Sequence, residues 1–284
     1  LAFFLEYLKL EDKMLEIEVF VIEGVGAKLS GRQLRVSYLL VKLLAHTDTL
    51  LNIIINHFQF RIDQKKWYKI RKTRFYPFDH HSICALGRVC FDAGLMLHYM
   101  SEPSLSIEQW NLRRKVLYLH DFSNRHRFLK AARKIHNSEL SPDVDDKWIK
   151  DGLVSDIKIH LDQLGIEEDQ KYTNGQMVFL SGVRGAVREA GWDVNGFEFQ
   201  QAYLSNFVHS HPVSFMRAVE HKVDFETSSP AQFTSALVAV MSANVVVHSS
   251  LERCRSFLTH DGDPLASFFD DDGVQIDKSS ELNM

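Results

Sequence analysis

The chain has 284 residues, of which 45% are hydrophobic and 25% are charged, and its formal net charge is -4. This composition excludes a disordered chain and allows one large domain or two smaller ones. The three cysteines, Cys84, Cys90 and Cys254, have no C-x-x-C spacing, which argues against a disulfide framework and a thiolate zinc site. We therefore expect a globular, cytoplasmic protein without a metal or other cofactor.

Helical periodicity and helix-capping signals predict an all-α fold, a bundle of about eight helices. The first helix is expected over residues 1–23, before Gly24. Ser30 and Gln33 have the spacing of a capping box and open a second, long helix toward Phe60. Charged and polar residues interrupt this second helix, which favours a core helix over a membrane span: they are Lys42, His46, Asp48, Asn52 and Asn56. We therefore expect no contact with a membrane.

The third helix, over residues 78–100, is apolar apart from one narrow polar stripe. At about 100° per residue, His81, Arg88, Asp92 and Tyr99 lie within roughly 20° of one line. An unpaired buried charge costs several kcal/mol, so Arg88 and Asp92 must pair with each other or with other polar groups. We expect the stripe to meet residues 203–211 in the interior, either as a functional site or as a structural ion pair.

The rest of the chain also predicts helices. Ser106 and Gln109 open a helix that is expected to break near residues 121–124, and Gly165 ends the next one. Later helices are expected over residues 176–190 and 197–210 and from Pro230 onward. The polar stretch 166–175 suggests a boundary between subdomains. The expected division is a helical core with a basic face at 1–165, a C-terminal helical subdomain at 166–260 and a loosely ordered acidic tail at 261–284.

Positive charge is concentrated between residues 61 and 136, where 16 Lys and Arg face 6 Asp and Glu. One part of this region, KKWYKIRKTRFY, interleaves cations with aromatic side chains, which suits phosphate contact and base stacking. We expect RNA or another polyanion as its partner, bound by Lys65, Lys66, Lys69, Arg71, Lys72 and Arg74. The alternative is a solvated loop whose aromatic side chains dock on the core.

An arginine and a histidine with R-x(4–6)-H spacing occur at Arg114 and His120, on a predicted helix within the basic region. This spacing resembles that of the HEPN superfamily of all-helical nucleotide-binding and ribonuclease domains. The resemblance implies a site without metal that activates the ribose 2'-hydroxyl, steadies the phosphate and is assembled across a dimer. Lys115 departs from the superfamily pattern, which prefers Asn, Asp or His after the arginine.

A second resemblance rests on LGRVCFDAGLMLHYM and the later YLSNFVHSHP. These stretches resemble a loosely defined group of uncharacterised bacterial helical proteins with an Arg-x-x-x-Glu/Asp helix and a later Ser-x-x-x-His. Arg88, Asp92, Ser205 and His209 are the matching positions. The resemblance implies an all-α fold and a phage-defence or stress-related setting.

Together these patterns predict a defence or stress effector that acts on nucleic acid, and the most specific hypothesis is a HEPN-like ribonuclease. Its candidate catalytic residues are Arg114, His120, Arg88, Asp92 and His209. One alternative is a non-catalytic helical module that binds a protein partner or forms a homodimer. Another is an HD-type metal-dependent phosphohydrolase, because His120-Asp121 and His260-Asp261 both spell the HD pair.

Overall fold

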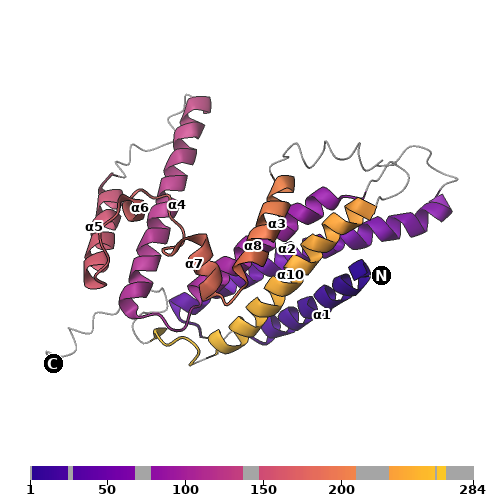
Figure 1. Ribbon diagram of the computed structural model, residues 1–284, viewed down its shortest axis with the longest axis horizontal. Helices are drawn as coiled ribbons and strands as arrows, with labels where there is room; N and C mark the ends of the chain where they lie inside the picture. The colour runs from indigo at the N-terminus through magenta and orange to yellow at the C-terminus, as the bar shows by residue number, and fades with distance from the viewer. Residues whose placement is uncertain are drawn as a thin grey trace. The chain divides into compact units, whose positions relative to one another are not determined.

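The computed structural model describes residues 2–24, 28–67, 78–136, 147–208, 230–259 and 261–266, with only the backbone at 59–67 and 133–136. All the regular secondary structure in these ranges is helical, with no β-strand, which confirms the predicted all-α fold (Figure 1). The helices are α1 (Ala2–Glu23), α2 (Gly31–Trp67), α3 (His80–Met100), α4 (Ile107–His136), α5 (Lys147–Gln163), α6 (Gln170–Thr173), α7 (Gly182–Glu189), α8 (Val194–Val208) and α10 (Pro230–Phe257).

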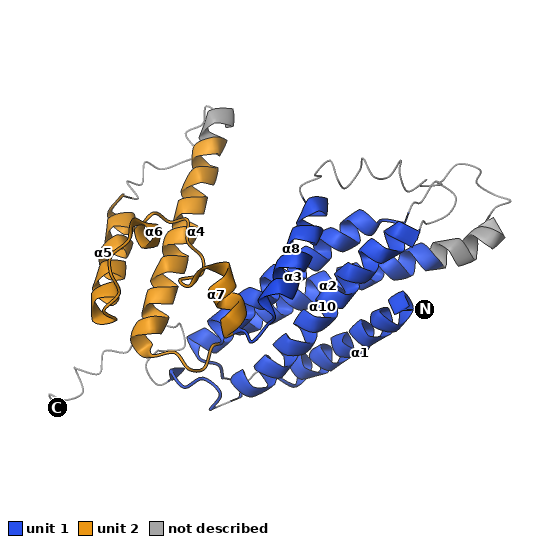
Figure 2. Cartoon of the chain, in the orientation of Figure 1, with its two compact units in different colours: residues 1–101, 190–284 blue, residues 102–189 orange. Residues whose placement is uncertain are grey.

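The chain divides into two compact units (Figure 2). Unit 1 comprises residues 1–101 and 190–284, and unit 2 comprises residues 102–189. The boundary expected near residue 165 falls inside unit 2, because the polar stretch that suggested it contains the short helix α6. Unit 1 is instead built from two segments that are far apart in the sequence.

Local capping chemistry starts the helices as the sequence indicates. The backbone N–H of Ser30 donates to Gln33 Oε1 at 2.9 Å, and the N–H of Gln33 donates to Ser30 Oγ at 3.1 Å. Ser106 and Gln109 make the same reciprocal pair at 2.9 and 3.2 Å. Each pair satisfies two backbone donors that a helix start leaves open, which is why α2 and α4 begin where they do.

Helix α3 is the central element of unit 1 and packs against α10, α2 and α8. Gly87 permits a close approach to α10, since a Cβ at this position would lie 2.9 Å from Ala239 Cβ and 3.2 Å from the Ala239 carbonyl oxygen. Gly94, two turns later, faces Val246 of the same helix. Small residues on facing helices let the backbones pack tightly, so these two glycines fix how α3 lies on α10.

A buried polar cluster ties together the ends of three helices in unit 1. Arg32, at the start of α2, donates from Nη1 to Asp263 Oδ1 at 3.0 Å and from Nε to the carbonyl of Met100 at 2.9 Å. Ser30 Oγ donates to the other Asp263 oxygen at 2.7 Å. The side chain of Gln33 donates to the carbonyl of Phe257 at 2.8 Å. Asp263 was assigned to the loosely ordered tail from sequence, yet it is buried here; residues 267–284 lie outside the described ranges.

Three helices of unit 1 are long and apolar enough to cross a membrane: Gly31–Phe58 of α2, the whole of α3 and the whole of α10. The expectations of a cytoplasmic protein and of no membrane contact were therefore wrong. The expectation of a cytoplasmic protein rested on the sparse cysteines, and that of no membrane contact rested on the polar interruptions of α2. Among these interruptions only Lys42 and Asp48 carry a full charge, and long apolar helices tolerate isolated charges.

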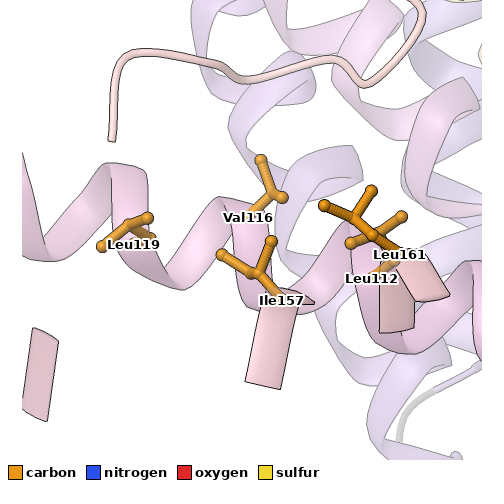
Figure 3. Close-up of a cluster of buried hydrophobic side chains, with 5 residues drawn as sticks. All are labelled: Leu112, Val116, Leu119, Ile157 and Leu161. Atoms are coloured by element: carbon orange, nitrogen blue, oxygen red, sulfur yellow. The ribbon is translucent and has the colours of Figure 1, made fainter. Parts of the chain in front are cut away.

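Unit 2 has its own small core between α4 and α5. Leu112, Val116 and Leu119 of α4 are buried against Ile157 and Leu161 of α5 (Figure 3). Gly165, with a φ of 63°, follows α5 and takes the left-handed conformation that ends many helices. The predicted helix over 176–190 is shorter in the structure, where only Gly182–Glu189 is helical.

Helix α4 runs without the break that was expected near residues 121–124. The polar residues of this stretch form interactions that suit a helix instead of a loop. Arg125 Nε and Asp121 Oδ2 form an ion pair at 2.9 Å, and the rings of Phe122 and His126 stack with centroids 6.4 Å apart. Both pairs are four residues apart, the spacing that places side chains on one helix face.

Candidate functional site

The structure brings Arg88, Asp92 and Ser205 together where α3 packs on α8. Arg88 donates from Nη1 to Asp92 Oδ1 and from Nε to Ser205 Oγ, the latter at 3.2 Å. The Arg88 side chain is 15% exposed and the Asp92 side chain is 56% exposed. The guanidinium is therefore held by two partners at the edge of the helix pair, with the carboxylate on the solvent side.

The other residues of the predicted stripe fall into different surroundings. His81 packs its ring against Phe207 of α8 with centroids 5.5 Å apart, and Tyr99 is buried. On α8, the Tyr203 hydroxyl lies 2.8 Å from Ser235 Oγ of α10. His209 lies outside the described residues, so its relation to Ser205 stays a prediction. His81 and Arg88 of the stripe thus contact α8, whereas Asp92 lies on the solvent side and not in the interior as expected.

The cations of α4 before His120 each have a partner within unit 2. Arg113 pairs with Glu189 at 2.6 Å, and Lys115 Nζ lies 2.5 Å from Asp156 Oδ2 of α5. Arg114 Nη2 donates to Asn111 Oδ1 at 3.3 Å. Arg113 and Lys115 therefore hold α7 and α5 against α4, and Arg114 is the cation of this run that is bound within its own helix.

Arg114 and His120 do not share one face of α4. His120 is six positions after Arg114, with five residues between them, so their side chains leave the axis about 120° apart and roughly 9 Å apart along it. His120 is half-buried, and its Nδ1 atom is buried with no hydrogen-bond partner among the described residues. A single copy of α4 therefore does not form the predicted pair as a direct contact.

Beyond His120, helix α4 carries an exposed basic and aromatic surface. Arg125 is 77% exposed and Phe128 is 72% exposed, and they lie one turn apart on one side of the helix. Arg127 and Lys130 are also exposed, and they lie about 100–160° away around the axis. Arg127 also donates to Asn124 one turn earlier. We call Arg125, Arg127, Phe128 and Lys130 the α4 basic surface. The sequence indicated positive charge between residues 61 and 136 but not this surface, because the expected break near residues 121–124 separated it from Arg114 and His120.

The side chains predicted to contact nucleic acid on the earlier basic segment lie outside the described ones. Lys65 and Lys66 lie in the last turn of α2, where only the backbone is described. Lys69, Arg71, Lys72 and Arg74 lie outside the described residues. Within the basic region between residues 61 and 136, the exposed Lys and Arg side chains that the structure describes are therefore those of the α4 basic surface.

The candidate catalytic residues belong to both units. Arg88 and Asp92 are in unit 1, whereas Arg114 and His120 are in unit 2. In the described ranges, no group of three His, Cys, Asp or Glu side chains is arranged to hold a metal ion. Of the two HD pairs, His120-Asp121 lies on α4 and His260 lies outside the described residues.

In comparisons with known proteins, no protein-family model, curated protein or solved structure matches the chain.

Proposed function

We propose that this protein binds single-stranded nucleic acid through the α4 basic surface. The observation that carries the proposal is the exposure of Phe128 with Arg125 on one side of α4, and of Arg127 and Lys130 on the other side of the same turns. Cations that reach solvent neutralise phosphates, and an exposed aromatic ring offers a face on which an unpaired base stacks. The surface thus supplies both parts of a single-strand binding site.

The ion pairs formed by other cations near the predicted sites support the choice of α4 as the binding surface. Arg113 and Lys115 are engaged in ion pairs that hold helices together, and Arg88 pairs with Asp92 within α3. A cation that already neutralises a carboxylate gains less from a phosphate, so these three are poor candidates for contacts with a polyanion. Arg125 is also paired, with Asp121, so the proposal depends mainly on Arg127 and Lys130. Lys130 is exposed without an ion pair among the described residues, and the partner of Arg127 is the neutral amide of Asn124.

Binding is tested with a fluorescent oligonucleotide of about 20 uridines, measured by anisotropy at several salt concentrations. For single strands, the slope of log K against log salt is about -0.7 for each neutralised phosphate, so Arg127→Glu/Lys130→Glu should make the slope shallower by roughly 1.4. Lys150→Glu/Lys158→Glu on α5 changes the net charge equally and is the matched control. Equal losses in both variants would refute the assignment to α4.

The HEPN-like interpretation is the sharper form of this proposal, with His120 as general base and Arg114 at the phosphate. Their separation of about 120° around the helix requires the second residue of a working pair to come from another copy of the chain. Cleavage of RNA in the presence of a chelator, lost in His120→Ala, would support it. Binding without cleavage by the wild-type chain would leave a nucleic-acid-binding module, and cleavage that the chelator abolishes would favour the HD alternative.

A further inference from the structure

Helix α1 presents two apolar faces, of which one is covered. The covered face holds Phe3, Tyr7, Leu10, Met14 and Ile17 and packs on α10 and α2. The second face carries six large apolar side chains that are between 46% and 70% exposed: Phe4, Leu5, Leu8, Leu15, Val19 and Ile22. Scattered exposed apolar residues are normal, but a contiguous row of this kind marks an interaction surface.

The row has the geometry of a helix-binding seam. At about 100° per residue, Phe4, Leu8, Leu15, Val19 and Ile22 lie within roughly 60° of one another around the axis, and Leu5 lies beside them. They extend over five turns of α1, about 27 Å along its axis. We call these six residues the α1 outer stripe.

Both edges of the α1 outer stripe are acidic. Glu11 and Glu18 lie on one side of it and Asp12 and Glu23 on the other, and all four are exposed. None of the four makes an ion pair within the described part of the chain. The two lysines of α1 do not offset them, because Lys9 already pairs with Glu6 at 2.7 Å and Lys13 with Glu16 at 2.6 Å.

The acidic edges decide what can cover the stripe. Helices that lie on membrane surfaces carry Lys and Arg beside their apolar face, because lipid headgroups are anionic or zwitterionic. A second copy of α1 would bring acid against acid on both edges. An amphipathic helix with an apolar seam bordered by Lys or Arg would bury the stripe and neutralise both edges, as charged edge positions do in paired helices.

We infer that the α1 outer stripe binds a basic amphipathic helix of a partner protein. The seam supplies the apolar contact, and Glu11, Glu18, Asp12 and Glu23 select for basic edge residues on the partner. This interaction is independent of the α4 basic surface, which lies in the other unit and has the opposite charge. The protein would accordingly carry two recognition surfaces of different chemistry.

The probe is a synthetic helical peptide with Leu at the seam and Lys at the flanking positions, labelled and measured by anisotropy against the full chain. A peptide with Glu at the flanking positions is its control. We expect the Lys peptide to bind at least tenfold more tightly than the Glu peptide. Leu8→Ser/Leu15→Ser/Val19→Ser should weaken the Lys peptide at least tenfold, with far-UV circular dichroism unchanged because all three positions are exposed.

Two further variants test whether the acidic edge residues of the stripe bind the Lys peptide, or whether the negative charge of the whole protein attracts it. Glu11→Lys/Glu18→Lys should weaken the Lys peptide, whereas Glu167→Lys/Glu168→Lys, with the same charge change on exposed residues of unit 2, should not. Equal effects of the two variants would overturn the inference. The inference would also be overturned by a different effect of the Leu8→Ser/Leu15→Ser/Val19→Ser variant. In that outcome, the variant abolishes binding of the chain to phosphatidylcholine vesicles, or its dimerisation, but leaves peptide binding unchanged.

Discussion

Replacement of Asp263 by alanine should destabilise unit 1 severely, although Asp263 is more than 200 residues from Ser30 and Arg32 in the sequence. Its carboxylate accepts hydrogen bonds from Arg32 at 3.0 Å, Ser30 at 2.7 Å and the backbone N–H of Leu265 at 3.1 Å. The side chains of Arg32 and Asp263 are 1% and 0% exposed. The substitution would therefore leave a guanidinium buried without its counter-charge.

The expected loss follows from what Arg32 retains. Removal of one partner of a buried ion pair costs about 3–5 kcal/mol of unfolding free energy. Arg32 keeps its hydrogen bond to the Met100 carbonyl and its position over the Phe257 ring, 5.0 Å from the centroid. We therefore expect a loss near the lower end, about 3 kcal/mol, which is a large part of the 5–15 kcal/mol typical of a folded domain.

Urea unfolding followed by far-UV circular dichroism measures this loss, and the midpoint and the slope are compared between variants. Asp121→Ala is the matched control, because it removes the carboxylate of an exposed ion pair with Arg125 on α4. That pair should contribute less than about 1 kcal/mol. Arg32→Met/Asp263→Leu should recover most of the stability, since apolar residues of similar volume replace buried ion pairs at little cost. If Asp263→Ala costs no more than Asp121→Ala, the reasoning is refuted.

Three further predictions concern unit 1. Gly87→Ala should cost about 1–3 kcal/mol because the new methyl group meets Ala239 across the close approach of α3 and α10, and an unchanged urea midpoint would contradict that packing. Ser205→Ala should cost about 1 kcal/mol by removing the hydrogen bond to Arg88, and in Arg88→Met the same change should have almost no further effect on the midpoint. Three helices of sufficient length and hydropathy predict that the chain floats with lipid vesicles on a density gradient, and recovery of all the protein in the dense fraction would contradict this.

Much of the helical architecture could be predicted because it depends on local chemistry. The capping boxes at Ser30 and Ser106 act over three residues, and they are visible in the sequence and intact in the structure. A polar partner for Arg88 on α8 could also be predicted, since a charged residue on an apolar helix requires a hydrogen-bonding or ion-pairing partner.

The features that could not be predicted depend on distant contacts or on competing local effects. Asp263 is 231 residues from Arg32, and nothing in an acidic C-terminal stretch distinguishes a buried carboxylate from a solvated one. The polar residues 121–124 resembled a loop because their helix-supporting partners, Arg125 and His126, belonged to the next predicted segment. Missing that continuity hid the α4 basic surface.

The most direct test of the proposed function is the affinity of Phe128→Ala for the fluorescent oligouridine, measured beside a duplex of the same length. Loss of one stacked base is worth about 1–3 kcal/mol, so single-strand affinity should fall roughly five- to 150-fold. Duplex affinity should change little, because paired bases offer no free face to the ring. If Phe128→Ala binds the single strand as tightly as the wild-type chain, the α4 basic surface is not the site that we propose.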